Sequence, residues 1–136
     1  MTWFTLDDTE TPIPLSTYPA NHHELWPPMK DTIQGDGIHA EVSTVFLSLD
    51  HSFDQGTPVL WETMIFGGGD LDESTWRYTS ADDARKGHES ATRVVEQFFT
   101  YLRENADEIN AAEAVLRKVK NTACELAERS PEGARR

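Results

Sequence analysis

The sequence predicts an α+β protein, in which an antiparallel sheet of four to six strands precedes a long amphipathic C-terminal helix or an α-hairpin. Two observations lead to this prediction. Between residues 38 and 78, short runs rich in β-branched and aromatic residues alternate with turns that contain Gly and Pro. From residue 84 to residue 126, apolar or small side chains recur at alternating spacings of four and three, the period of a helix that packs through one stripe.

The strands are expected within the first 78 residues. Residues 3–6 are apolar, and residues 12–15 fit an edge strand or an extended arm because each of their two prolines lacks an N–H donor. Residues 16–31 fit an irregular loop or a short helix anchored by Trp26. The Gly35–Gly37 turn then leads into a central strand over residues 38–49, and two further strands follow at 59–66 and 76–78.

The helical part is expected to serve two purposes. Over residues 81–103 the apolar stripe is widened by Val94, Phe99 and Tyr101, which is typical of a helix lying on a sheet. Near Ile109 the flanks become acidic and the stripe narrows to the coiled-coil type. We therefore expect an α+β domain over residues 1–103, a helical extension for self-association over 104–130, and a tail over 131–136.

Asn105 leaves two arrangements open. Asn and Asp both serve as helix caps, so Asn105 and Asp107 can mark a bend or a break that produces an α-hairpin. If the helix is continuous, Asn105 lies in the stripe and fixes the register with a partner chain. A continuous helix needs a partner chain, whereas a folded-back hairpin fits a monomer. We expect a homo-oligomer, a dimer or larger, that forms through the C-terminal helix.

Charge and cysteine content exclude several classes of function. The net charge is −12, and residues 1–83 carry 15 acidic residues but only two basic ones. This excess disfavours direct binding of nucleic acid or of anionic lipid. No apolar run is long enough to cross a membrane, the N-terminus lacks the features of a secretory signal, and Cys124 is the only cysteine. We expect a protein of a reducing cytoplasm.

Several motifs occur together in a fixed order. They are WFTLD at residues 3–7, TPIP at 11–14, VSTVFLSLDHSF at 42–53, ETMIFGG at 62–68, WRY at 76–78 and GHE at 87–89. In this order they resemble a family of small proteins from actinobacteriophages and actinobacterial prophages. The resemblance covers about residues 3–95 and implies a phage-type origin. The proline-rich segment 16–31 and the extension beyond about residue 100 depart from the family pattern.

The order of elements and the strand at residues 62–66 are also similar to those of the phage sponge proteins that counter Thoeris defence. Such proteins build a sheet followed by helices, form oligomers and sequester signals of the cyclic ADP-ribose type. The similarity implies a ligand site with Phe66 near the strand end and Arg93 on the helix. From the residues themselves, a basic and aromatic cluster is expected, made of Arg77, Tyr78, Arg85, Lys86 and Arg93. Arginines bind phosphates and aromatic rings stack on bases. Ordinary charge on a helix face is the alternative.

Two reactive constellations are weaker. Asp50, His51 and Glu62 contain the groups of a small hydrolase, but no oxyanion-hole motif accompanies them, and Asp50 also suits a simple turn. The metal-ligand candidates are His22, His23 and Glu24 with His39 or His51. Their spacing matches no ligand motif, so we expect a polar loop and no metal. We expect no catalytic residue and no cofactor.

Two polar residues are expected to have structural roles. His88 lies on the apolar stripe and is predicted to be a core histidine bonded to a strand residue. Glu62 is predicted to pair with Arg77 across neighbouring strands, or to face a polar ligand. The sequence therefore favours a non-catalytic phage-type accessory protein that sequesters a nucleotide-like signal. An acidic antagonist or DNA mimic of a host protein, and the small hydrolase, are the alternatives.

Overall fold

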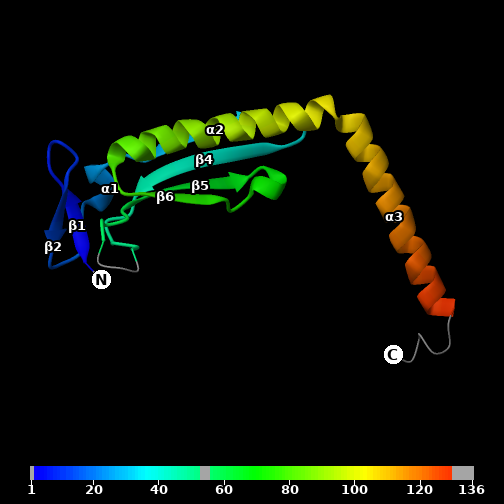
Figure 1. Cartoon of the computed structure of the whole chain (residues 1–136), viewed down its shortest axis with the longest axis horizontal. Coiled ribbons are helices and arrows are strands. Elements are labelled where there is room, and N and C mark those ends of the chain that lie inside the picture. The colour runs from blue at the N-terminus through cyan, green and yellow to red at the C-terminus, as the bar shows by residue number, and fades with distance from the viewer. Residues whose placement is uncertain (1, 53–55, 130–136) are drawn as a thin grey trace. The chain divides into compact units, whose positions relative to one another are not determined.

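The computed structural model describes residues 2–52 and 56–129, so the predicted tail at 131–136 and Phe53 of the family motif lie outside the described part. The chain divides into two compact units, Met1–Phe99 and Thr100–Arg136. The first unit contains two antiparallel sheets and most of helix α2, and the second contains helix α3 (Figure 1). The predicted α+β fold, with strands first and helices last, is confirmed.

The larger sheet has four antiparallel strands in the order β3-β4-β5-β6. The strands are β3 (Met29–Gln34), β4 (His39–Phe46), β5 (Trp61–Gly67) and β6 (Thr75–Tyr78). The predicted turn joins β3 to β4, and the Gly35 N–H donates to the Ile38 carbonyl at 2.7 Å. The central strand β4 pairs with a neighbouring strand along both edges, and its side chains on the α2 side (Ala40, Val42, Thr44 and Phe46) are buried.

A smaller hairpin precedes this sheet. It consists of β1 (Trp3–Leu6) and β2 (Pro12–Leu15), and the short helix α1 (His22–Leu25) follows it. The Phe4 N–H donates to the Ser48 carbonyl at 2.7 Å, so β1 also contacts the segment that leaves β4. Phe4 and Trp26 pack with Trp61 and Phe46 in one core cluster. Trp26 therefore has the anchoring role that the sequence predicted.

Helix α2 (Ala81–Glu104) covers one face of the four-stranded sheet (Figure 1). Its sheet-facing side chains are buried, and Ala84 and Val95 have no exposed surface. Alternate strand residues meet them, including Val42 and Ile65, which are also fully buried. The stripe from Ala84 to Val95 thus packs on the sheet, and this contact removes apolar surface of both α2 and the sheet from water.

Gly87 allows β6 and α2 to approach each other closely. A Cβ atom at Gly87 would overlap the ring and hydroxyl of Tyr78. Glycine lowers the stability of a helix interior, so its presence here is explained by the space that the tyrosine ring occupies. The contact fixes Tyr78 against α2.

Asn105 separates the two long helices. Helix α2 ends at Glu104 and α3 extends over Ala106–Arg129, so the structure has the break and not the continuous helix. The Asn105 Nδ2 group donates to the Tyr101 carbonyl at 2.9 Å, and the backbone N–H of Asn105 donates to the same carbonyl at 3.0 Å. The described residues include no helix that is long and apolar enough to cross a membrane.

Candidate functional site

A chain of hydrogen-bonded polar side chains runs between the sheet and α2. The Thr63 and Thr44 hydroxyls lie 2.6 Å apart, and the Thr44 hydroxyl lies 2.7 Å from His88 Nδ1. The other ring nitrogen, Nε2, lies 2.7 Å from Asp31 Oδ2 on β3. The prediction of a core histidine bonded to a strand residue is confirmed, and Asp31 is a further partner that the sequence did not reveal.

The order hydroxyl, imidazole, carboxylate is that of a nucleophile, a base and an orienting acid. A nucleophile must reach its substrate, however, and Thr44 and Thr63 are completely buried while His88 is 2% exposed. Only Asp31, with a side chain 60% exposed, meets solvent. The polar chain thus satisfies the buried groups of the interface between sheet and helix.

A second polar cluster joins the β1–β2 turn to α2. Arg85 Nη2 donates to both Glu10 carboxylate oxygens, at 2.7 and 2.5 Å, and Trp26 Nε1 donates to Oε2 at 2.6 Å. The Arg85 guanidinium also lies 5.7 Å from the centroid of the Trp26 ring. The bond from Arg85 holds the pKa of Glu10 below its ordinary value, despite an opposing contribution from burial. The sequence pattern groups Arg85 with the predicted basic and aromatic cluster and gives no sign of this contact with Glu10.

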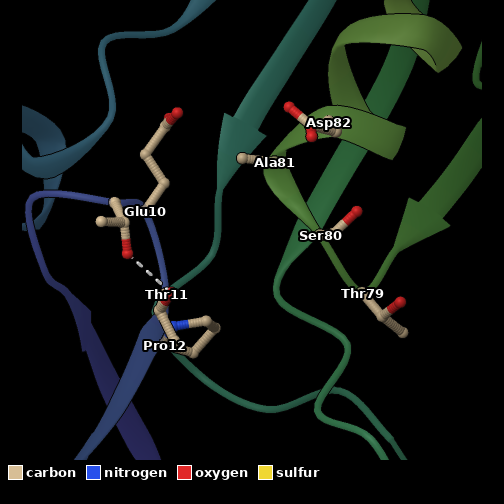
Figure 2. A pocket seen from close by; sticks show the side chains of 8 residues that line it. Glu10, Thr11, Pro12, Thr79, Ser80, Ala81 and Asp82 are labelled. Carbon is tan, nitrogen blue, oxygen red and sulfur yellow. Dashed lines mark hydrogen bonds between the residues drawn. The ribbon is translucent and has the colours of Figure 1, made fainter.

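A hollow of about 240 Å³ lies beside this cluster, between the β1–β2 turn and the start of α2. Figure 2 shows Glu10 and Thr11 on the turn and Ser80 and Asp82 at the helix start. The Ser80 hydroxyl accepts the Asp83 N–H at 3.1 Å and so caps the helix. Because carboxylates line the hollow and the cap is already formed, it does not suit a phosphate group.

Among the described residues of the first unit, no helix covers the face of the four-stranded sheet opposite α2 (Figure 1). We call it the open sheet face, and the strand register assigns to it the following side chains. They are Lys30, Thr32, Gln34, His39, Glu41, Ser43, Val45, Glu62, Met64, Phe66, Thr75 and Arg77. Glu62 Oε2 accepts from Arg77 Nε at 2.9 Å, which confirms the predicted cross-strand pair. Lys30 and Arg77 balance Glu41 and Glu62, so this face is near neutral although the chain is strongly acidic.

The four residues predicted to bind a ligand do not gather in one place. Phe66 and Arg77 lie on the open sheet face, and Phe66 is 48% exposed. Tyr78 points to the opposite face and packs on Gly87 of α2. Arg93 lies exposed on α2, where it donates to Ser90 Oγ at 3.3 Å. Of the predicted ligand residues, the structure therefore brings only Phe66 and Arg77 to a common surface.

Asp50 holds the loop that follows β4. Its carboxylate accepts from the Ser52 N–H at 2.8 Å, the Ser52 hydroxyl at 2.8 Å and the Val59 N–H at 3.0 Å. Burial raises the pKa of Asp50, but these hydrogen bonds outweigh burial and lower it. Glu62, another member of the proposed hydrolase set, is paired with Arg77. Both carboxylates thus have structural partners, and Asp50 has the turn-forming role that the sequence offered as the alternative.

Within residues 2–52 and 56–129 there is no cluster of three His, Cys, Asp or Glu side chains placed to hold a metal ion. The side chains of His22 and His23, two of the predicted metal-ligand candidates, lie outside the described part of the structure.

Helix α3 carries the second half of the heptad stripe. We call this half the α3 seam, and its members are Ile109, Ala112, Leu116, Val119, Ala123 and Leu126. Leu116 is 53% exposed, Val119 60% and Leu126 62%, while Val115 beside the seam is 64% exposed. A shallow apolar depression runs along Val119, Ala123 and Leu126. Large aliphatic side chains repeated along one helix face are typical of a surface that a partner covers.

Comparison of the chain with protein-family models, with curated proteins and with solved structures finds no match. The candidate surfaces are therefore judged on their own geometry.

Proposed function

We propose that this chain is a non-catalytic accessory protein of phage type that acts by binding and that assembles with copies of itself through α3. The observation that carries the proposal is the exposure of Leu116, Val119 and Leu126 at heptad spacing. Burial of such side chains against another helix removes them from water and favours association. A helix of 24 residues gains little stability from propensity alone and benefits from such a partner.

The location of the reactive groups supports action by binding. The hydroxyls of Thr44 and Thr63 and the imidazole of His88 are buried and bonded to one another, so their chemistry serves the fold. Asp50 and Glu62 are likewise engaged with their own structural partners. A protein that sequesters a molecule needs an accessible surface, and the open sheet face and the α3 seam both provide one.

Light scattering tests the assembly. The wild-type chain is expected to have twice the monomer mass, or more, at micromolar concentrations and to dissociate on dilution. Leu116→Asp is expected to be monomeric, because it places a charge in the seam. Asn121→Asp, on the outer side of the same helix, is the matched control and should retain the wild-type mass. A monomeric wild-type chain at every concentration would contradict the proposal.

We further propose the open sheet face as the ligand surface and a nucleotide-like defence signal as its ligand. Phe66 can stack on a base, and Arg77 can bind a phosphate after exchanging its Glu62 partner. Titration calorimetry with cyclic nucleotides and cyclic ADP-ribose should give heat with the wild-type chain and lose it in Phe66→Ala. Arg93→Ala, on the helix side, should bind as wild type. Absence of heat with every nucleotide would exclude this ligand class.

The acidic surface favours a second candidate, an antagonist or DNA mimic that binds a basic host protein. Among the described residues of the first 83 positions, ten acidic residues are exposed. They are Asp7, Asp8, Glu24, Asp31, Asp36, Asp70, Asp72, Glu73, Asp82 and Asp83. Such a complex should weaken steeply as salt is raised from 50 to 500 mM, because screening shortens the reach of these charges. Capture that is insensitive to salt would exclude it.

A further inference from the structure

We infer that the partner of the α3 seam is the α3 helix of a second copy, and that the two helices pair antiparallel about a centre between Arg117 and Lys118. The inference rests on the proposed self-association and adds its geometry. It is drawn from the residues that the seam brings into register and from the charges that flank it.

The antiparallel register matches large side chains with large ones and small with small. If two α3 helices cross about that centre, Ile109 meets Leu126 of the second copy and Leu116 meets Val119. Ala112 meets Ala123, and the symmetry of the pair repeats each layer. A parallel pair also brings large residues to large and small to small, so the layers permit the antiparallel pair and the flanking charges decide the orientation. The helix has about 36 Å of length for these layers, at 1.5 Å per residue.

The charges beside the seam distinguish the two orientations. With Ile109 and Leu116 at position a of the heptad, Glu113 and Lys120 both occupy position e, and Glu108 occupies position g. In an antiparallel pair the e positions of both helices line the same edge, so Glu113 faces Lys120 of the second copy at two symmetric places. In a parallel pair position g faces position e, so Glu108 would face Glu113 twice. The antiparallel arrangement therefore has two attractive pairs where the parallel one has two repulsive pairs.

Val115 gives a second, independent reason. It occupies position g and is 64% exposed. In the antiparallel arrangement it lies along the edge that contains Thr122 of the second copy, next to the apolar seam. In the parallel arrangement it would face the ammonium group of Lys120. Arg117 and Lys118 occupy positions b and c, outside the contact, so their charges remain in water in both arrangements.

Disulfide trapping in the full-length chain tests the orientation. In a Cys124→Ser background, one protein carries Ala112→Cys and a second, of different tag size, carries Ala123→Cys. After mixing and oxidation we expect the mixed disulfide to exceed either homodisulfide at least tenfold. In the antiparallel pair two copies of residue 112 lie about 16 Å apart along the axis, beyond the reach of a disulfide. Asn121→Cys, on the outer face, should form no disulfide and serves as the control.

Charge reversal supplies a second readout. Glu113→Lys should weaken the dimer about tenfold, since Lys would face Lys120 twice. The double variant Glu113→Lys/Lys120→Glu restores opposite charges and should return to within about twofold of wild type. A parallel pair predicts the opposite sign, because Glu113→Lys would then relieve the repulsion from Glu108.

The outcomes separate this inference from the proposed function. If the wild-type chain is dimeric but the cysteine variants form homodisulfides, or Glu113→Lys tightens the dimer, the antiparallel orientation is wrong. Self-association through α3 would still hold. A wild-type chain that stays monomeric would overturn both, and would direct attention to a different protein as the partner of the seam.

Discussion

The α2 and α3 helices carry the same heptad stripe in two different environments. In α2 the stripe lies on the sheet, and Ala84 and Val95 have no exposed surface. In α3 it meets water, and Leu116 and Val119 are more than half exposed. An identical spacing thus marks a fold core in one helix and an available surface in the other. Heptad spacing shows that a stripe exists, while the residues around it indicate what covers it.

The largest expected effect is a difference in the free energy of unfolding between two substitutions, one in the α2 half of the stripe and one in the α3 half. Val95→Asp should lower the free energy of unfolding by about 3–5 kcal/mol, because it buries a charge without a partner. Leu116→Asp should change it by no more than about 0.5 kcal/mol at a concentration where the chain is monomeric. Urea denaturation followed by circular dichroism measures both values. Val94→Asp, at a position 39% exposed, is the matched control in α2. An equal loss in the free energy of unfolding for Val95→Asp and Leu116→Asp would show that the two halves of the stripe do not differ in burial.

The next largest effect on the free energy of unfolding is expected from the buried polar chain between the sheet and α2. Thr44→Val removes the hydroxyl that contacts both Thr63 and His88, so two buried groups lose a partner. The expected loss in the free energy of unfolding is about 2 kcal/mol. Thr32→Val, on the open sheet face, should cost no more than about 0.5 kcal/mol. If the two variants denature at the same urea concentration, the polar chain does not contribute to stability.

Gly87 tests the close approach of α2 to the sheet. Gly87→Ala improves helix propensity, yet it should lower the free energy of unfolding by about 1 kcal/mol because the methyl group overlaps Tyr78. Lys86→Ala has no such neighbour and should be close to neutral. In the background of Tyr78→Ala the Gly87→Ala change should become stabilising. A stabilising effect with Tyr78 present would show that the ring moves away without cost.

The smallest effect concerns Glu10 and depends on pH. The pKa of Glu10 is lowered in the folded state, so its contribution is present above the ordinary glutamate pKa and is lost as the pH falls through the lower, folded value. Glu10→Gln should therefore cost about 0.5–1 kcal/mol at pH 7 and less at pH 3. A Glu10→Gln effect of equal size at pH 3 and pH 7 would show that the negative charge of Glu10 does not contribute to the stability of the fold.

Local patterns predicted most of the fold. The turn at Gly35–Gly37, the strand that follows it and the burial of His88 follow from spacing and residue type. The spacing at Asn105 fits a break and a continuous helix alike. The width of the stripe also distinguished the sheet-covering part from the extension. These features depend on neighbours in sequence, which a single chain displays.

The candidate site was less accessible to sequence reasoning. Arg77, Tyr78 and Arg93 are close in sequence, but strand alternation turns Arg77 and Tyr78 to opposite faces of the sheet. The Glu10–Arg85 contact joins residues 75 positions apart, and nothing in either local sequence marks it. Asp31 reaches His88 across 57 positions in the same way. Long-range polar contacts depend on the packed arrangement of elements, which local patterns do not contain.

Hydrogen exchange at two protein concentrations tests most directly whether α3 is a surface for a partner. At high concentration the amides of α3 should exchange at least tenfold more slowly than at low concentration, because a paired helix opens less often. Amides of α2 between Ala84 and Val95 should exchange at the same rate in both samples, since the sheet already covers them. Exchange in α3 that does not respond to concentration would contradict self-association through this helix.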